Sequence, residues 1–178
     1  ALGVDKPCLV VPHGAYDIFN TKNLSMAEAR KNFPGIRETD FVVLFFGFLG
    51  ERKGIMEFLD TADRLGGNGR IKFLVAGKPE DKSFILEALN RLRNRTHVVI
   101  HDHAIPFVDV QKYFAASDLV ALPYTEGTTS GVLKLAMAFG KPVLWTDIGD
   151  FPETMKSWSG LLLDKSKLRQ DLHDKVLL

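Results

Sequence analysis

Residues 41–46 read Phe41-Val42-Val43-Leu44-Phe45-Phe46 and run directly into Gly47. Every position in this stretch is apolar, whereas a strand with one face in water alternates apolar and polar residues. Similar apolar runs occur at residues 8–11, 71–76, 98–100, 119–122, 143–145 and 161–163. The pattern predicts strands that are covered on both faces, as in a parallel sheet.

Amphipathic segments separate these runs and predict helices. They lie at about residues 25–33, 54–65, 82–93, 108–116, 130–139 and 152–155, with a last helix near residue 165. Ser25 and Glu28 have capping-box spacing, which predicts a helix start. The second segment has an apolar face that we expect in the core, formed by Ile55, Phe58, Leu59, Ala62 and Leu65. The alternation of strand and helix predicts a single Rossmann-like domain, a doubly wound parallel α/β sheet.

Composition limits the class of protein. The chain has 178 residues, 46% hydrophobic and 25% charged, so its apolar surface is large enough to exclude a disordered segment. Lys and Arg number 23 against 22 Asp and Glu. The net charge of +1 argues against nucleic acid or an anionic membrane as the main partner, so any phosphate binding is local.

The sequence also bears on the cellular compartment. Cys8 is the only cysteine, which excludes an intrachain disulfide or a cysteine zinc cluster and is typical of a reducing compartment. The apolar runs are far shorter than the ~20 residues of a membrane-spanning helix. The first residues lack the basic and apolar regions of a signal peptide. We therefore expect a soluble, cytoplasmic chain.

Ligands of doubly wound sheets bind beyond the carboxyl ends of the strands, so the loops there are the first candidates for a site. The loop after residues 41–46 reads Gly47-Phe48-Leu49-Gly50-Glu51-Arg52-Lys53-Gly54. Its glycines permit close backbone approach, and a helix beginning near Gly54 directs N–H groups at an anion. Arg52 and Lys53 add cations. The loop matches neither the dinucleotide fingerprint nor the P-loop pattern. A solvated basic turn is the alternative.

The loop after residues 119–122 reads Pro123-Tyr124-Thr125-Glu126-Gly127-Thr128-Thr129-Ser130-Gly131-Val132. Backbone N–H groups near Thr129 to Val132, with hydroxyls and the helix dipole, predict a phosphate cradle. Glu126 is placed to accept hydrogen bonds from a sugar hydroxyl. The alternative is a Thr or Ser helix cap with Glu126 solvated. Two anion sites at neighbouring strand ends suggest one ligand with phosphates and hydroxyls, such as a nucleotide sugar.

A series of motifs then occurs in one order: Gly47 followed by Lys53-Gly54, Val75-Ala76-Gly77, Ala116-Ser117-Asp118, Pro123-Tyr124-Thr125-Glu126-Gly127 and Ala136-Met137-Ala138-Phe139-Gly140-Lys141-Pro142-Val143. They resemble the carboxyl-terminal half of family 4 retaining glycosyltransferases, which have the GT-B architecture. Pro12-His13-Gly14 followed by Phe19 resembles the segment just after the interdomain hinge of those enzymes. The resemblance extends from about Pro7 to Leu163.

The resemblance implies one half of a GT-B fold that binds a UDP- or GDP-sugar, with no metal and no other cofactor. It implies Lys53 and Glu126 as catalytic residues, Lys53 pairing with the diphosphate and Glu126 facing the transferred sugar. Transfer with retention would pass through an oxocarbenium-like state while Lys53 stabilises the leaving diphosphate. The other implied donor contacts are Gly47, Arg52, Lys78, Ile105, Thr128, Thr129, Ser130, Gly131, Val132, Lys134 and His13. Ile105 lies in the 103–107 loop, which resembles the loop that frames the nucleobase.

Two positions depart from the family's pattern. Phe48 stands where the family usually has Arg, so Arg52 would have to supply the second phosphate cation. Lys134 stands where the family usually has a second Glu, and an ammonium cannot accept hydrogen bonds from ribose hydroxyls. Lys134 then either pairs with Glu126 or a phosphate, or is solvated. These departures favour a non-catalytic nucleotide-binding or interaction module as one alternative; a sugar-nucleotide epimerase half is another.

Enzymes of this architecture have two such domains. We therefore expect residues 1–178 to be the donor-binding domain, with 1–24 on the side of the interdomain hinge and 165–178 forming a terminal helix. The absent acceptor domain would bind an acceptor sugar, lipid or glycan in polysaccharide biosynthesis and would supply any membrane contact. We expect the chain alone to be inactive or nearly so.

His101-Asp102-His103 is the pattern most suggestive of a metal. At the end of a strand His101 and His103 share a face and Asp102 points away. Two ligands remain where tetrahedral zinc needs at least three, so we predict no metal site here.

Overall fold

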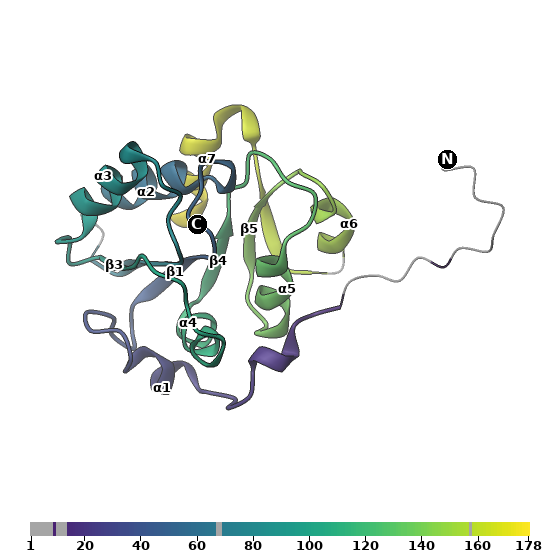
Figure 1. Cartoon of the computed structure of the whole chain (residues 1–178), viewed down its shortest axis with the longest axis horizontal. Coiled ribbons are helices and arrows are strands. Elements are labelled where there is room, and N and C mark those ends of the chain that lie inside the picture. Colours follow the sequence, from purple (N-terminus) through teal and green to yellow (C-terminus); the bar gives the residue numbers. More distant parts are fainter. Residues whose placement is uncertain (1–8, 10–13, 67–68, 157) are drawn as a thin grey trace.

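The computed structural model describes residues 9, 14–66, 69–156 and 158–178. Its centre is a parallel sheet with the strand order β3-β2-β1-β4-β5-β6 (Figure 1). The strands are β1 (Phe41–Phe46), β2 (Ile71–Ala76), β3 (Val98–His101), β4 (Leu119–Leu122), β5 (Val143–Thr146) and β6 (Gly160–Leu163). This order is that of a doubly wound Rossmann-type sheet, so the predicted fold is confirmed.

The apolar runs located the strands closely. β1, β2 and β4 have the bounds that the sequence predicted. β3 and β5 each continue for one more residue, because His101 and Thr146 still pair with Ala76 and Leu163 of the neighbouring strands. Backbone pairing continues there although the side chains are polar. The predicted strand at residues 8–11 falls almost entirely outside the described residues.

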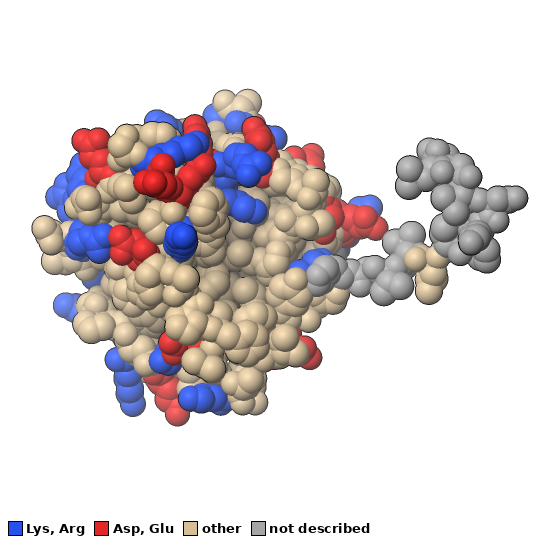
Figure 2. Space-filling model, in the orientation of Figure 1, with Lys and Arg blue, Asp and Glu red and all other residues tan. Residues whose placement is uncertain are grey.

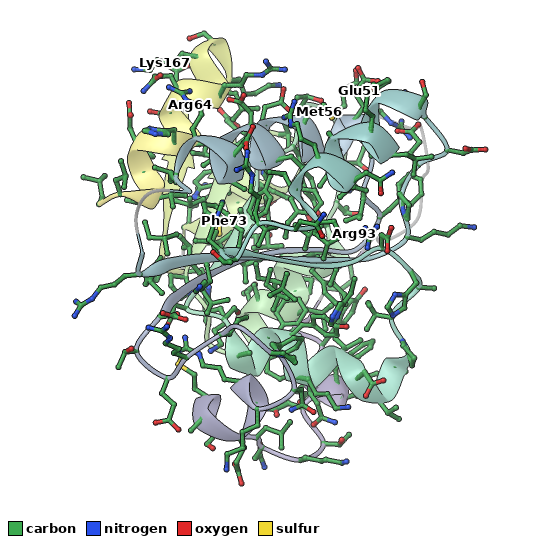
Figure 3. The ribbon with its side chains drawn as sticks, turned by 90° about the vertical axis from the view of Figure 1, so that its left-hand side faces the viewer. Glu51, Met56, Arg64, Phe73, Arg93 and Lys167 are labelled. Carbon is green, nitrogen blue, oxygen red and sulfur yellow. The ribbon has the colours of Figure 1, made fainter. Side chains whose placement is uncertain are left out.

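Helices cover both faces of the sheet. One face carries α2 (Ile55–Arg64), α3 (Ser83–Leu92) and α7 (Leu168–Val176), and the other carries α1 (Met26–Arg30), α4 (Val110–Ala116), α5 (Gly131–Ala138) and α6 (Phe151–Met155). Figure 3 shows the sheet edge-on between these two layers. The layering explains why the strands are mostly apolar, because each strand is packed from both sides.

The helix ends follow local chemistry. The predicted capping box starts α1: Ser25 Oγ accepts from the Glu28 N–H at 3.2 Å, and the Glu28 carboxylate accepts from the Ser25 N–H at 2.9 Å. α1 ends at Arg30, earlier than predicted, and Pro34 follows, which disfavours a helical conformation in the residue before it. The predicted start near residue 165 is a 3₁₀ turn, Lys165–Lys167, and α7 begins after it.

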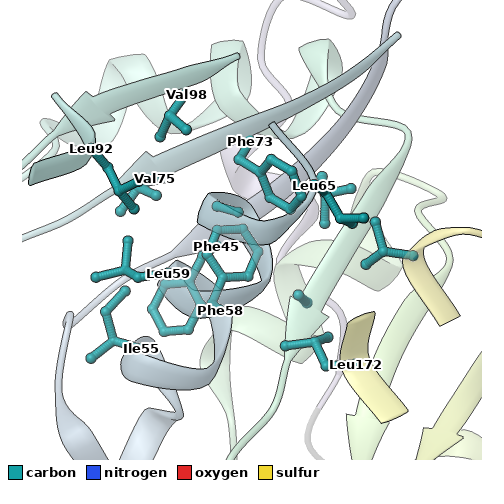
Figure 4. Close-up of a cluster of buried hydrophobic side chains, with 14 of the residues drawn as sticks. Phe45, Ile55, Phe58, Leu59, Leu65, Phe73, Val75, Leu92, Val98 and Leu172 are labelled. Atoms are coloured by element: carbon teal, nitrogen blue, oxygen red, sulfur yellow. The ribbon is translucent and has the colours of Figure 1, made fainter. Parts of the chain in front are cut away.

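The core beneath α2 is centred on three aromatic rings (Figure 4). The ring centroid of Phe58 lies 5.2 Å from that of Phe45 and 5.5 Å from that of Phe73. The predicted apolar face of α2 is buried in this core, with Ile55, Phe58, Leu59, Ala62 and Leu65 all included. The core therefore fixes α2, and with it the loop that joins α2 to β1.

Within the described ranges, no helix has both the length and the apolarity to cross a membrane. On the face shown in Figure 2, Lys and Arg are interspersed with Asp and Glu, and neither sign forms a continuous patch. This face therefore offers no extended surface of one charge.

Candidate functional site

The candidate site lies at the topological switch point of the sheet, where the order of the strands reverses. β1 and β4 are neighbours, with Val43 paired to Leu119 and Leu44 to Val120. After β1 the chain turns to α2 on one face, and after β4 it turns to α5 on the other. The loops diverge from adjacent strand ends, which is where doubly wound folds bind their ligands.

The two loops touch through their backbones. The N–H groups of Thr125 and Glu126 donate to the Arg52 carbonyl oxygen, at 3.0 and 3.4 Å respectively. Gly54 lies so close to Pro123 that a Cβ atom on it would be 2.0 Å from the Pro123 carbonyl oxygen. The prediction that the basic glycine loop and the threonine-serine loop meet at one edge of the sheet is confirmed.

A hollow of about 210 Å³ lies between these loops. It is lined by Phe48, Gly50, Arg52, Lys53, Glu80, Glu126, Gly127, Thr128 and Thr129. Both predicted catalytic residues, Lys53 and Glu126, are in this lining. Small-molecule sites usually start at ~300 Å³, so a ligand of nucleotide-sugar size would extend beyond the hollow. We call this hollow the switch-point pocket.

Lys53 is held over an aromatic ring. Its Nζ lies 3.9 Å from the centroid of the Tyr124 ring, within the range of a cation–π interaction. Partial burial and, secondly, repulsion from Arg52 lower the pKa of Lys53 below the ordinary lysine value. The ammonium is therefore positioned and incompletely hydrated, which strengthens its attraction to an anion in the pocket.

Ser130 caps α5. Its hydroxyl accepts from the Leu133 N–H at 3.2 Å and lies 3.2 Å from the hydroxyl of Tyr124. The Ser130 side chain is buried, whereas Thr128 and Thr129 are exposed in the pocket and Gly131 is exposed at the first turn of the helix. The helix cap and the predicted cradle thus use different hydroxyls, and those of the two threonines remain accessible to a ligand.

Two further contacts connect the segments beside the pocket. A Cβ atom on Gly47 would lie 3.2 Å from Cγ2 of Val132, so these two predicted contact residues face each other. The Asp150 N–H, in the loop after β5, donates to the Thr128 carbonyl oxygen at 2.8 Å. The position of Thr128 is therefore supported by a third strand end.

The expectation for Lys134 is corrected. The sequence predicted a solvated lysine or one paired with Glu126 or a phosphate. The residue is only 7% exposed and its Nζ donates to Thr154 Oγ1 at 3.2 Å, so it is not solvated, and pairing with a phosphate stays a prediction. No ion pair joins it to Glu126 within the described part of the chain. The reason is tertiary: Lys134 lies on the first turns of α5, and Thr154 belongs to α6, on the same face of the sheet.

Besides Lys134, six predicted contacts among the described residues are not in the pocket lining: Gly47, Ser130, Gly131, Val132, Lys78 and Ile105. Lys78 is exposed at the end of β2, and its carbonyl oxygen accepts from the Leu49 N–H at 2.9 Å. Ile105 packs against the core on the α4 side, in the loop after β3, a strand separated from β1 by β2. His13 lies outside the described residues. These assignments stay predictions.

Two residues at the site were missed. Glu80 lines the pocket, and its carboxylate accepts from the Glu51 N–H at 3.1 Å, which lowers the pKa of Glu80. It follows the strand at residues 71–76, so the strand-end rule pointed to it. The Tyr16 ring contacts Gly131, on which a Cβ atom would lie 3.2 Å from Tyr16 Cε2. Tyr16 precedes β1, the first strand of the described sheet, so the strand-end rule did not point to it. No sequence pattern singles it out either.

The side chains of the histidine motif have partners in the fold. His101 Nδ1 lies 2.7 Å from the Tyr113 hydroxyl, and burial, followed by the charge of His103, lowers the pKa of His101. Asp102 pairs with Arg93 at 2.6 Å. Among the described residues, no three His, Cys, Asp or Glu side chains come together as a metal site would require.

The chain is similar to known proteins in both sequence and structure. Residues 40–177 match the family described as Glycosyl transferases group 1. Over 150 residues the chain is 28% identical to a Bacillus subtilis protein named as a candidate teichuronic acid biosynthesis glycosyltransferase, which covers 84% of this chain and 35% of that protein. The chain spans about a third of the length of the curated relatives it matches.

Solved structures show the same fold. WaaG, a glycosyltransferase involved in lipopolysaccharide biosynthesis, superposes with a TM-score of 0.72 at 20% identity, covering 96% of this chain and 47% of that one. HepE of Anabaena in complex with UDP gives a TM-score of 0.66 at 21% identity, covering 85% and 42%. The same protein with UDP and glucose also gives 0.66, at 22% identity over 85% and 41% of the two chains. The fold is that of one domain of a GT-B glycosyltransferase, and the chain belongs to the Glycosyl transferases group 1 family.

Proposed function

We propose that this chain is the donor-binding domain of a retaining glycosyltransferase and holds the diphosphate of a UDP- or GDP-sugar in the switch-point pocket. The observation that carries the proposal is the contact between the two loops, which gathers Arg52, Lys53, Glu126, Thr128 and Thr129 around one hollow. The structural neighbour HepE, solved with UDP and with UDP and glucose, supports a donor of this class.

Each residue has a chemical role in this proposal. Lys53 and Arg52 neutralise the charge that develops on the leaving diphosphate. Thr128 and Thr129, together with N–H groups at the start of α5, donate to phosphate oxygens. The exposed Glu126 carboxylate accepts hydrogen bonds from hydroxyls of the sugar. These roles require no metal and no cofactor.

The transfer itself requires an acceptor. We propose that the sugar passes through an oxocarbenium-like state and keeps its configuration, and that a second domain holds an acceptor sugar, lipid or glycan. By this proposal the chain alone binds the donor but transfers almost no sugar. Detectable sugar transfer by the chain alone would contradict the proposal that a second domain is needed to hold the acceptor.

Calorimetric titration with UDP, GDP and ADP tests the proposal. We expect binding of UDP or GDP and weaker binding of ADP. Tighter binding of ADP would contradict a UDP- or GDP-sugar donor. If none of the three binds, the donor proposal is wrong, and a non-catalytic interaction module, which the departures at Phe48 and Lys134 favour, becomes the better function.

Glu126→Gln is expected to leave the affinity for free UDP unchanged and to weaken UDP-glucose by about fivefold, because a charged hydrogen bond to a sugar hydroxyl becomes a neutral one. If GDP is the preferred nucleotide, GDP and GDP-mannose replace this pair. The measurement is the ratio of the two dissociation constants. Glu153→Gln, at an exposed glutamate of α6, is the matched control. Equal losses for both ligands would assign Glu126 to the structure of the loop.

The affinity for the diphosphate is expected to fall as pH rises through the lowered pKa of Lys53. Burial and Arg52 lower this pKa in the free chain, whereas a bound diphosphate favours the ammonium and raises it again. Binding therefore takes up a proton above the lowered pKa, and the contribution of Lys53 is complete only below it. Tyr124, whose pKa burial raises to about 12, stays neutral beneath the ammonium through most of this range.

Titrations from neutral to alkaline pH measure this decline. Lys53→Arg is the control, because a guanidinium remains charged throughout. The prediction is wrong if the wild-type affinity does not change with pH, or if Lys53→Arg shows the same decline.

A further inference from the structure

Phe48 presents an apolar ring inside a charged pocket. The ring is 52% exposed and shares the lining with Arg52, Lys53, Glu80 and Glu126. Among the described residues that line the pocket, it is the only aromatic one. The fold packs one side of this ring and leaves much of it open to the hollow.

The position of the ring is fixed by the turn around it. A Cβ atom on Gly50 would lie 3.0 Å from both Cδ1 and Cε1 of Phe48, so the ring rests on the Gly50 backbone. The Gly50 N–H donates to the Phe48 carbonyl oxygen at 3.0 Å. Leu49, between them, is fully buried, and its carbonyl oxygen accepts from the Glu80 N–H at 3.0 Å. A surface built in this way loses little freedom when a ligand covers it.

The chemistry of the ring selects one part of a nucleotide sugar. A phosphate gains nothing from an aromatic face, because that face is electron-rich and repels an anion. Arg52 and Lys53 border the same small hollow, so the group beside Phe48 is one that is attached directly to the diphosphate. The nucleobase is separated from the diphosphate by the ribose. The ribose and the transferred sugar therefore remain as the two candidate groups beside Phe48.

The partners around Phe48 favour the transferred sugar. A pyranose carries hydroxyls around its edge and C–H groups on its faces. Glu126, in the same lining, accepts hydrogen bonds from hydroxyls, and the Phe48 ring offers an apolar surface to C–H groups. We propose that Phe48 is a specificity-determining residue that packs against the C–H face of the sugar carried by the diphosphate. This inference rests on the proposed function.

The test compares UDP with UDP-glucose, and GDP with GDP-mannose, on the same chain. The quantity measured is the ratio of the dissociation constants of nucleotide and nucleotide sugar. Phe48→Ala is expected to weaken the nucleotide sugar by about fivefold relative to the nucleotide, the loss of one aromatic contact. Phe48→Tyr keeps the ring and is expected to restore the wild-type ratio, whereas Phe48→Leu, which is apolar without a ring, is not. Phe41→Ala removes a phenylalanine of similar exposure, 40%, at the amino end of β1 and is the control.

The outcomes separate this inference from the proposed function. If wild type binds neither nucleotide nor nucleotide sugar, the proposed function fails. A different result is that wild type binds both ligands while Phe48→Ala leaves the ratio of dissociation constants unchanged, either with neither affinity reduced or with both reduced equally. That result overturns the inference about Phe48 and leaves the proposed nucleotide site intact. A loss in Phe48→Ala that Phe48→Tyr does not repair also overturns it. Thermal melting of each variant confirms that the chain is folded.

Discussion

Lys53→Ala is expected to weaken binding of the nucleoside diphosphate by about 1.5–3 kcal/mol, the range of a hydrogen bond to a charged group. This corresponds to a loss of affinity from about tenfold to more than a hundredfold. The effect is large because the ammonium is already held over the Tyr124 ring and is partly shielded from water. Calorimetric titration of wild type and variant with UDP and GDP measures it.

The control for Lys53→Ala is a lysine of the same chain with no part in the pocket. Lys31, exposed at the end of α1, meets this condition, and Lys31→Ala is expected to bind like wild type. Lys53→Arg is expected to retain most of the affinity, because the charge remains. Unchanged affinity in Lys53→Ala would remove Lys53 from the site, and an equal loss in Lys31→Ala would show that only the net charge matters.

The fold was predictable from the sequence because a strand that is buried on both faces can be recognised from its own residues. The strands of a doubly wound sheet are mostly apolar, without the alternation of a half-exposed strand, so the bounds of β1, β2 and β4 were predicted to the residue. The meeting of the two loops was also predictable, because adjacent parallel strands end at the same edge of the sheet. For these features the topology follows from the order of the elements.

Side-chain burial was less predictable, because it depends on segments that are distant in the chain. Lys134 is buried beside Thr154 of α6, and the Ser130 hydroxyl is turned toward Tyr124 and the start of its own helix. Tyr16 reaches Gly131 from far away in the sequence. No periodicity in α5 indicates any of these contacts, since each depends on how a separate element packs.

Gly54→Ala is expected to destabilise the fold by about 4 kcal/mol and to abolish diphosphate binding. Gly54 has a φ of +72°, a left-handed conformation that costs a residue with Cβ about 1–2 kcal/mol. Its Cβ would also lie 2.0 Å from the Pro123 carbonyl oxygen and 2.8 Å from the carbonyl carbon, and both are backbone atoms. Relief requires the two loops to separate, which breaks the bonds from Thr125 and Glu126 to the Arg52 carbonyl oxygen.

A second glycine separates the cost of the left-handed backbone from the cost of the clash with Pro123. Gly140 has a similar φ of +65°, but a Cβ atom there would meet nothing within 4 Å, so Gly140→Ala carries only the conformational term of about 1–2 kcal/mol. Gly69→Ala carries neither term and is expected to melt like wild type. Denaturant unfolding of the three variants measures stability, and titration with UDP and GDP measures binding. If Gly54→Ala lost no more stability than Gly140→Ala and still bound the diphosphate, the contact between the loops would not be what holds the pocket together.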